Sequence, residues 1–189
     1  MASPVTAGVA ALTLLAHPEL TPFQLSEILI STANPNLYDT NPTRIGLLGS
    51  GIVDAYKAVT NTKFYSLSIS NYEFTKTNDP NNTEINDDIT CGLRIQNVLD
   101  DLPELECNVT AFDQLTVQSI ELTNDKFAIT AIQSGLSKYI ESAFSFKIIK
   151  EIPNDSKLKF KLVFYSNTDT IKTIFVDVLL NKSYLNFSN

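Results

Sequence analysis

Residues 89–96, which read Ile-Thr-Cys-Gly-Leu-Arg-Ile-Gln, place Cys91, Leu93 and Ile95 at every second position. Successive side chains of a strand point to opposite faces, so this period of two predicts a β-strand with one buried face. Leu105, Cys107 and Val109 repeat the pattern in the next segment. Both cysteines are therefore expected to point toward one apolar core.

The chain after residue 62 continues in the same way. Short runs rich in Val, Ile, Phe, Thr and Tyr alternate with turn signals such as Ile152-Pro153-Asn154-Asp155. The expected strands cover residues 64–70, 89–96, 105–112, 115–122, 126–132, 143–150, 158–165 and 171–180. Seven or eight short strands with regular turns predict a β-sandwich.

The two cysteines leave one question open. If the strands around 91 and 107 form a hairpin that turns near residue 99, Cys91 and Cys107 lie opposite each other. A disulfide and a pair of buried thiols are then equally compatible with the sequence. With a single histidine, His17, far away in the chain, the cysteines define no metal site.

The first 62 residues have a different composition, rich in Ala, Leu and Pro. Pro4 suits a first helical turn, because its missing N–H costs nothing there. Val5 to Ala16 is apolar on all sides and contains several small residues, which predicts a buried helix. The neighbours that would bury it are not expected within this chain.

Two further helices have recognisable starts. Thr21 is a candidate N-cap, with Pro22 at the first helical position and Gln24 in capping-box register. Asp54 is expected to cap a short helix over residues 55–59. The Asn- and Pro-rich stretch 34–46 between them is predicted to be a loop.

Charge and composition exclude several classes of protein. The 189 residues carry a net charge of −7, and the 14 basic residues form no cluster, which argues against a nucleic-acid partner. The sequence has no run of about 18 apolar residues, so no membrane span is expected. A hydrophobic fraction of 43% is enough for a packed core. No signal peptide is recognisable at the start, and no cofactor or metal motif is present.

Three segments of the first 60 residues carry a family resemblance. They are Met1–Pro4 with Ala7–Leu12, His17–Leu29 with Ser31–Ala33, and Gly49–Val59. In this order and at this spacing they resemble the C-terminal end of the catalytic domain of subtilisin-like serine proteases. Residues 63–189 more loosely resemble the β-sandwich that follows this domain in some bacterial members, notably those of Bacteroidetes type.

The resemblance implies a fold class and a division of the chain. It implies an α+β fragment, in which residues 1–62 are the helical C-terminal end of a subtilisin-like α/β catalytic domain. Residues 63–189 would be an accessory all-β sandwich of immunoglobulin or fibronectin type. The family's nucleophilic serine would stand immediately before Met1, and its catalytic aspartate and histidine would lie further upstream.

Three residues within the chain resemble catalytic types but do not match catalytic positions. Ser3 corresponds to the second serine of the family signature, inside the helix. His17 matches no catalytic position, and a solvent-exposed structural role is expected. Asp54 is interpreted as a helix cap. No catalytic, cofactor-binding or metal-binding residue is therefore assigned.

The acidic pairs Asp87-Asp88 and Asp100-Asp101 offer ligands of the kind that calcium prefers. No spacing typical of a calcium loop surrounds them, so they are interpreted as turn residues. The sequence does not indicate what the predicted sandwich binds.

The expected function is that of an inactive C-terminal fragment of a subtilisin-like serine endopeptidase. The parent would hydrolyse peptide bonds of a peptide or protein substrate without a cofactor, and the family implies a secreted or cell-surface location. The alternative is a non-catalytic β-sandwich module that binds or interacts with a partner. Substrate specificity and oligomeric state are not encoded in any recognisable motif.

Overall fold

A computed structural model describes residues 2–44, 46–76 and 83–181. These residues form two compact units. Unit 1 contains residues 1–67 together with 96–102 and 132–136, and unit 2 contains the rest of the chain. The predicted domain boundary at residues 62–63 stays a prediction.

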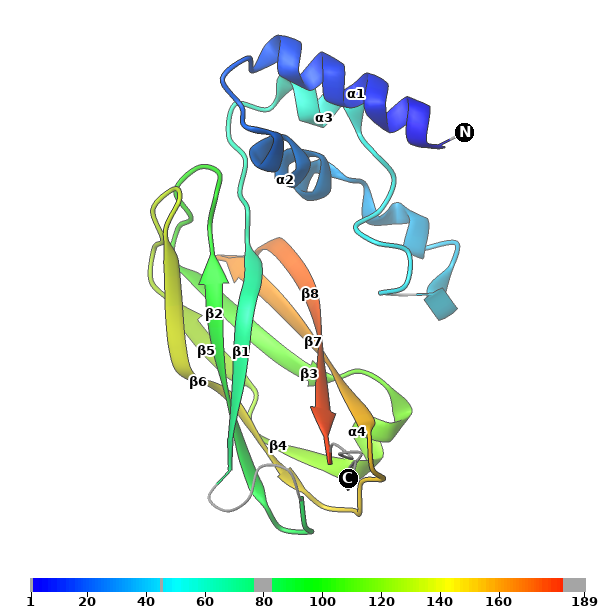
Figure 1. The fold of residues 1–189 in the computed structure, drawn as a ribbon, viewed down its shortest axis with the longest axis vertical. Coiled ribbons are helices and arrows are strands. Elements are labelled where there is room, and N and C mark those ends of the chain that lie inside the picture. The colour runs from blue at the N-terminus through cyan, green and yellow to red at the C-terminus, as the bar shows by residue number, and fades with distance from the viewer. Residues whose placement is uncertain (1, 45, 77–82, 182–189) are drawn as a thin grey trace, which may run out of the picture. The chain divides into compact units, whose positions relative to one another are not determined.

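Unit 2 is a β-sandwich of two antiparallel four-stranded sheets (Figure 1). The first sheet has the order β1-β2-β6-β4 and the second has the order β5-β3-β7-β8. The strands are β1 (Ser68–Lys76), β2 (Asp88–Gln96), β3 (Leu105–Ala111), β4 (Ile120–Asn124), β5 (Lys126–Ile129), β6 (Ser137–Ile148), β7 (Ser156–Ser166) and β8 (Asp169–Leu180).

The core of the sandwich follows from the period of two in its strands. On β7, Leu158, Phe160, Leu162 and Phe164 are all fully buried, and the residues between them are not. Aromatic rings join the two sheets. The ring of Phe160 on β7 lies 5.0 Å from that of Phe144 and 5.1 Å from that of Phe146 on β6.

One segment belongs to both sheets. Residues Ile120 to Asn124 pair with β6, and Lys126 to Ile129 pair with β3. The change of sheet occurs at Asp125, whose carbonyl accepts a hydrogen bond of 2.7 Å from the Val109 amide. This switch connects the two layers covalently as well as through their shared core.

The strand predicted over residues 115–122 is partly wrong. The short helix α4 (Gln114–Ser119) precedes β4, and its N-cap is Asp113, whose carboxylate accepts a hydrogen bond of 2.8 Å from the Thr116 amide. The alternation of polar and apolar residues predicted a strand there. The Asp113 cap, which the alternating pattern does not reveal, stabilises a helical turn instead.

Unit 1 contains the helices α1 (Ala2–Ala16), α2 (Pro22–Thr32) and α3 (Ala55–Thr60), with two single 3-10 turns, η1 (Pro35–Tyr38) and η2 (Pro42–Arg44). The predicted caps are confirmed. Thr21 and Gln24 form a capping box, and Asp54 accepts a hydrogen bond of 2.9 Å from the Lys57 amide. Local polar chemistry therefore fixes where α2 and α3 begin.

The predicted fold class is wrong. The described residues are mostly β-sheet, with 42% strand against 26% helix, and both sheets are antiparallel. Its helices have 15, 11 and 6 residues in unit 1, with one more of 6 in unit 2. In the described ranges they cover no parallel sheet, so no extended subtilisin-like catalytic domain is formed. The motifs correctly predicted short helices, but short motifs do not specify the layers around them.

Helix α1 is unusual because it is apolar in composition but mostly exposed. It carries no charged residue, yet only Val9 and Thr13 are buried. Val5, Leu12 and Leu15 are 59, 52 and 80% exposed. The prediction of a buried helix is therefore not met within the described residues, where most of α1 is exposed. No helix in the described ranges is both long and apolar enough to cross a membrane.

Gly51 allows a close approach between two loops of unit 1. Its φ is +128°, and a Cβ there would lie 2.1 Å from the carbonyl oxygen of Asn34. Asn34 and Ile52 exchange two backbone hydrogen bonds of 2.7 and 2.9 Å at this point. A side chain at residue 51 would therefore break the bridge.

We expect Gly51→Ala to lower the free energy of unfolding by roughly 2–3 kcal/mol, because the backbone strain and the clash cannot both be relieved. Urea unfolding followed by circular dichroism measures this. Gly8→Ala is the matched control, since nothing lies within 4 Å of that position in α1 and alanine favours helix. Equal stability of Gly51→Ala and the original chain would contradict the geometry.

Candidate functional site

The residues of catalytic type lie apart in the structure. Ser3 is exposed in the first turn of α1, whereas His17 directly follows the end of that helix. At about 1.5 Å per residue, the helix separates them by roughly 20 Å. Because a histidine base must be within hydrogen-bond distance of its nucleophile, Ser3 and His17 cannot act together.

His17 is less exposed than expected. Its ring lies edge-on to Phe64 with 5.4 Å between the ring centroids. The Nε2 atom is buried and has no hydrogen-bond partner among the described residues. The prediction of a solvent-exposed histidine is therefore wrong, because Phe64 of unit 1 covers one side of the ring.

A shallow pocket of about 290 Å³ in unit 1 brings His17 near an acid and a serine. It is lined in part by His17, Asp100 and Ser134. A catalytic triad requires the aspartate to hold the histidine and the histidine to hold the serine. Here Asp100 accepts from the Phe64 amide instead, and the Ser134 amide donates to Asp101. The residue types are present without the connections that catalysis needs.

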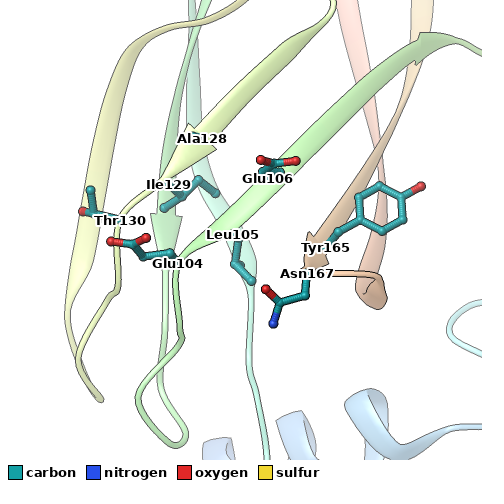
Figure 2. Close-up of a pocket in the computed structure, with 8 residues that line it drawn as sticks. All are labelled: Glu104, Leu105, Glu106, Ala128, Ile129, Thr130, Tyr165 and Asn167. Atoms are coloured by element: carbon teal, nitrogen blue, oxygen red, sulfur yellow. The ribbon is translucent and has the colours of Figure 1, made fainter.

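A second pocket lies in unit 2 at one end of β3, β5 and β7 and has a volume of about 340 Å³. Figure 2 shows the carboxylates of Glu104 and Glu106 at this pocket, with Tyr165 and Asn167 beside them. Neither lysine, arginine, histidine nor cysteine lines it. Two exposed carboxylates without a base, a nucleophile or a third ligand define no reaction and no metal site.

The acidic pairs serve as structural anchors. Asp100 accepts a hydrogen bond of 2.7 Å from the Phe64 amide, and Asp101 accepts one of 2.7 Å from the Ser134 amide. Asp87 forms an ion pair of 2.7 Å with Lys76 in which both side chains are largely buried. No group of three or more possible metal ligands occurs in the described part of the chain.

The two cysteines are buried, as predicted, and both are free thiols. The predicted hairpin is wrong, because β2 and β3 belong to different sheets. Burial raises the pKa of each thiol from 9.0 to about 12. Such thiols are poor nucleophiles, since only the thiolate reacts.

The comparisons with known proteins add no assignment. No protein-family model matches this chain, and the search of curated proteins found no match. The resemblance to subtilisin-like proteases therefore depends on the sequence motifs, chiefly the three in the first 60 residues.

We expect Cys91 and Cys107 to react very slowly with Ellman's reagent at pH 8 in the folded protein, because only about one thiol in ten thousand is ionised when the pKa is near 12. In guanidinium chloride both should react at once. The Cys91→Ala variant should then show a single reactive thiol. A denatured chain without reactive thiols would indicate a disulfide instead.

Asp87 should make unit 2 sensitive to acid. Desolvation raises the pKa of its carboxyl, but hydrogen bonds from Lys76 and from the Glu84 amide, with the charge of Lys76, outweigh it. The folded pKa is thus below the unfolded one. The stabilisation is complete above about pH 4 and is lost as the pH falls through the lower folded value.

We therefore expect Lys76→Met to cost about 1–3 kcal/mol near neutral pH and to flatten the loss of stability below about pH 4. Urea unfolding at several pH values measures both effects. Lys157→Met is the control, because Lys157 is exposed on β7 and no ion pair of it occurs among the described residues. An unchanged pH profile in Lys76→Met would refute the role of this pair.

Proposed function

We propose that this chain is a non-catalytic part of a subtilisin-like serine endopeptidase. Hydrolysis of peptide bonds would be carried out by residues outside this sequence. The support from the sequence is the set of three motifs, which occur in the family's order and spacing. The resemblance also favours a peptide or protein substrate for the parent and a secreted or cell-surface location.

The observation that carries the proposal is the exposed apolar surface of the first 60 residues. Ten of the sixteen large hydrophobic side chains that are exposed in the described residues lie there. The same 60 residues contain only six charged ones: Glu19, Glu27, Asp39, Arg44, Asp54 and Lys57. Soluble domains rarely leave so much apolar surface open, and such surfaces are usually interfaces.

The surface suits burial within a larger protein better than brief contact with a partner. Transient interfaces carry polar and charged rims, whereas α1 has no charge at all along its length. Permanent interfaces resemble a hydrophobic core cut in two. The remainder of an endopeptidase would provide such a complement.

The separation of Ser3 from His17 also supports a non-catalytic role for this chain. The His17 ring rests on Phe64, and none of its described hydrogen bonds involves a serine hydroxyl. Asp54, the third residue type, caps α3. His17 and Asp54 thus have structural roles, and Ser3 lies too far from His17 to be activated by it.

The second candidate function is a β-sandwich binding module, as the sequence also allowed. It is favoured by the complete core of unit 2, in which Phe144, Phe146, Phe160 and Phe164 are all fully buried. In-frame stop codons upstream of Met1 would favour this module. The endopeptidase would be favoured if the reading frame upstream of Met1 encodes Gly-Thr-Ser and, further upstream, the histidine and aspartate motifs of the family.

We expect the purified 189-residue chain to release no fluorophore from quenched peptide substrates and to take up no fluorophosphonate label, because none of the described hydrogen bonds of the single histidine, His17, involves a serine hydroxyl. The Ser3→Ala variant serves as the control for background hydrolysis. Turnover that the Ser3→Ala substitution abolishes would overturn the proposal for this chain.

A further inference from the structure

Two loops that connect strands of the sandwich belong to unit 1. Residues 96–102 lead from β2 to β3, and residues 132–136 lead from β5 to β6. Leu99 of the first loop is 5% exposed and joins the hydrophobic cluster of Val9, Ile28, Ala58 and Phe64. The helices of unit 1 therefore share their core with a loop far away in the sequence.

Directional hydrogen bonds accompany this apolar contact. The Gln24 side-chain amide on α2 donates to the Val98 carbonyl at 3.2 Å, across 74 residues of sequence. The Phe64 amide donates to the Asp100 carboxylate at 2.7 Å. Because Gln24 also completes the capping box of α2, one side chain links the start of this helix to the loop.

Asn97 fixes the two loops to each other. It is fully buried, and its side-chain amide donates to the carbonyls of Asp100 at 2.9 Å and Ile132 at 3.0 Å. Its side-chain oxygen accepts from the Leu99 amide at 3.2 Å. A backbone hydrogen bond of 2.9 Å from its own N–H to the Leu136 carbonyl completes the set.

We propose that residues 96–102 and 132–136 form an intramolecular clamp that keeps the helical segment folded. The strands β2, β3, β5 and β6 hold the ends of both loops, and Asn97 joins the loops. This assigns the sandwich a role in this chain beyond the proposed function and independent of it. Its connections supply part of the core and several hydrogen bonds without which the helices would stand alone.

The lengths of the helices explain why a clamp is needed. Isolated helices shorter than about 12–15 residues are marginal in water, and α2 and α3 have 11 and 6 residues. Helix α1 buries only Val9 and Thr13. A loop already ordered by its strands offers its contacts at a low cost in chain entropy, so it stabilises short helices efficiently.

The clamp also implies an order of folding. The contacts of Gln24 and Phe64 with loop 96–102 cannot form until the chain beyond residue 96 is in place. The helical segment, although first in the sequence, should therefore become stable only after residues 96–102 are in place.

Hydrogen exchange followed by mass spectrometry on the full chain tests the clamp. In Asp100→Ala, we expect amides of α2 and α3 to exchange at least about tenfold faster, whereas those of β3 and β7 should keep their protection. Asn97→Ala should give the same pattern more strongly. Asn108→Ala is the matched control, because Asn108 is exposed on β3, and no change is expected in α2 or α3.

Unchanged exchange of α2 and α3 in Asp100→Ala would overturn the proposal. Equal acceleration in both units would overturn it too, because the loops would then support the whole chain rather than the helices. If Asn97→Ala proves insoluble, Asp100→Ala decides alone, since its exposed carboxylate can be removed without opening a cavity. None of these outcomes depends on whether the parent is an endopeptidase.

Discussion

The contact of Phe160 with Phe144 and Phe146 is the interaction on which the rest of the structure depends. It joins the two sheets of the sandwich at ring distances of 5.0 and 5.1 Å. Buried aromatic rings supply large apolar areas, so a few of them can hold two layers together. Once the layers are fixed, so are the ends of the loops at 96–102 and 132–136. The order of the helical unit then follows from the order of those loops.

The helical unit, in contrast to the sandwich, has little buried apolar core. Its hydrophobic cluster is small, and its largest helix is uncharged but mostly uncovered. The exposed side chains of Leu12 and Leu15 contribute no hydrophobic stabilisation to this unit. Its stability must therefore come from the contacts with loops 96–102 and 132–136, or from a further protein surface that covers these side chains. The clamp and the proposed place in a larger endopeptidase both explain how a helical segment with so little buried apolar surface could be stable.

The sequence predicted well wherever one residue type has one local physical effect. The capping box at Thr21, the cap at Asp54 and the buried alternation around Cys91 all follow from such effects. It failed where two local signals competed, as at residues 115–119, or where distant partners were involved. The role of Asn97 was missed because nothing near it in the sequence indicates that its amide bridges two loops. Ser3 and His17 could be dismissed from motif position alone, but the contact of His17 with Phe64 could not be foreseen.

By itself, the sequence determined the alternating strands around Cys91 and Cys107, the starts of α2 and α3 and the burial of both cysteines, because period, caps and apolarity act over a few residues. Only the tertiary structure decided that β2 and β3 lie in different sheets and that Cys91 and Cys107 remain free. It also decided that Leu99 joins the hydrophobic cluster of the helices within unit 1 and that the helices cover no parallel sheet in the described ranges. Those outcomes depend on which distant surfaces bury each other most completely, and a local pattern of residues does not contain that comparison.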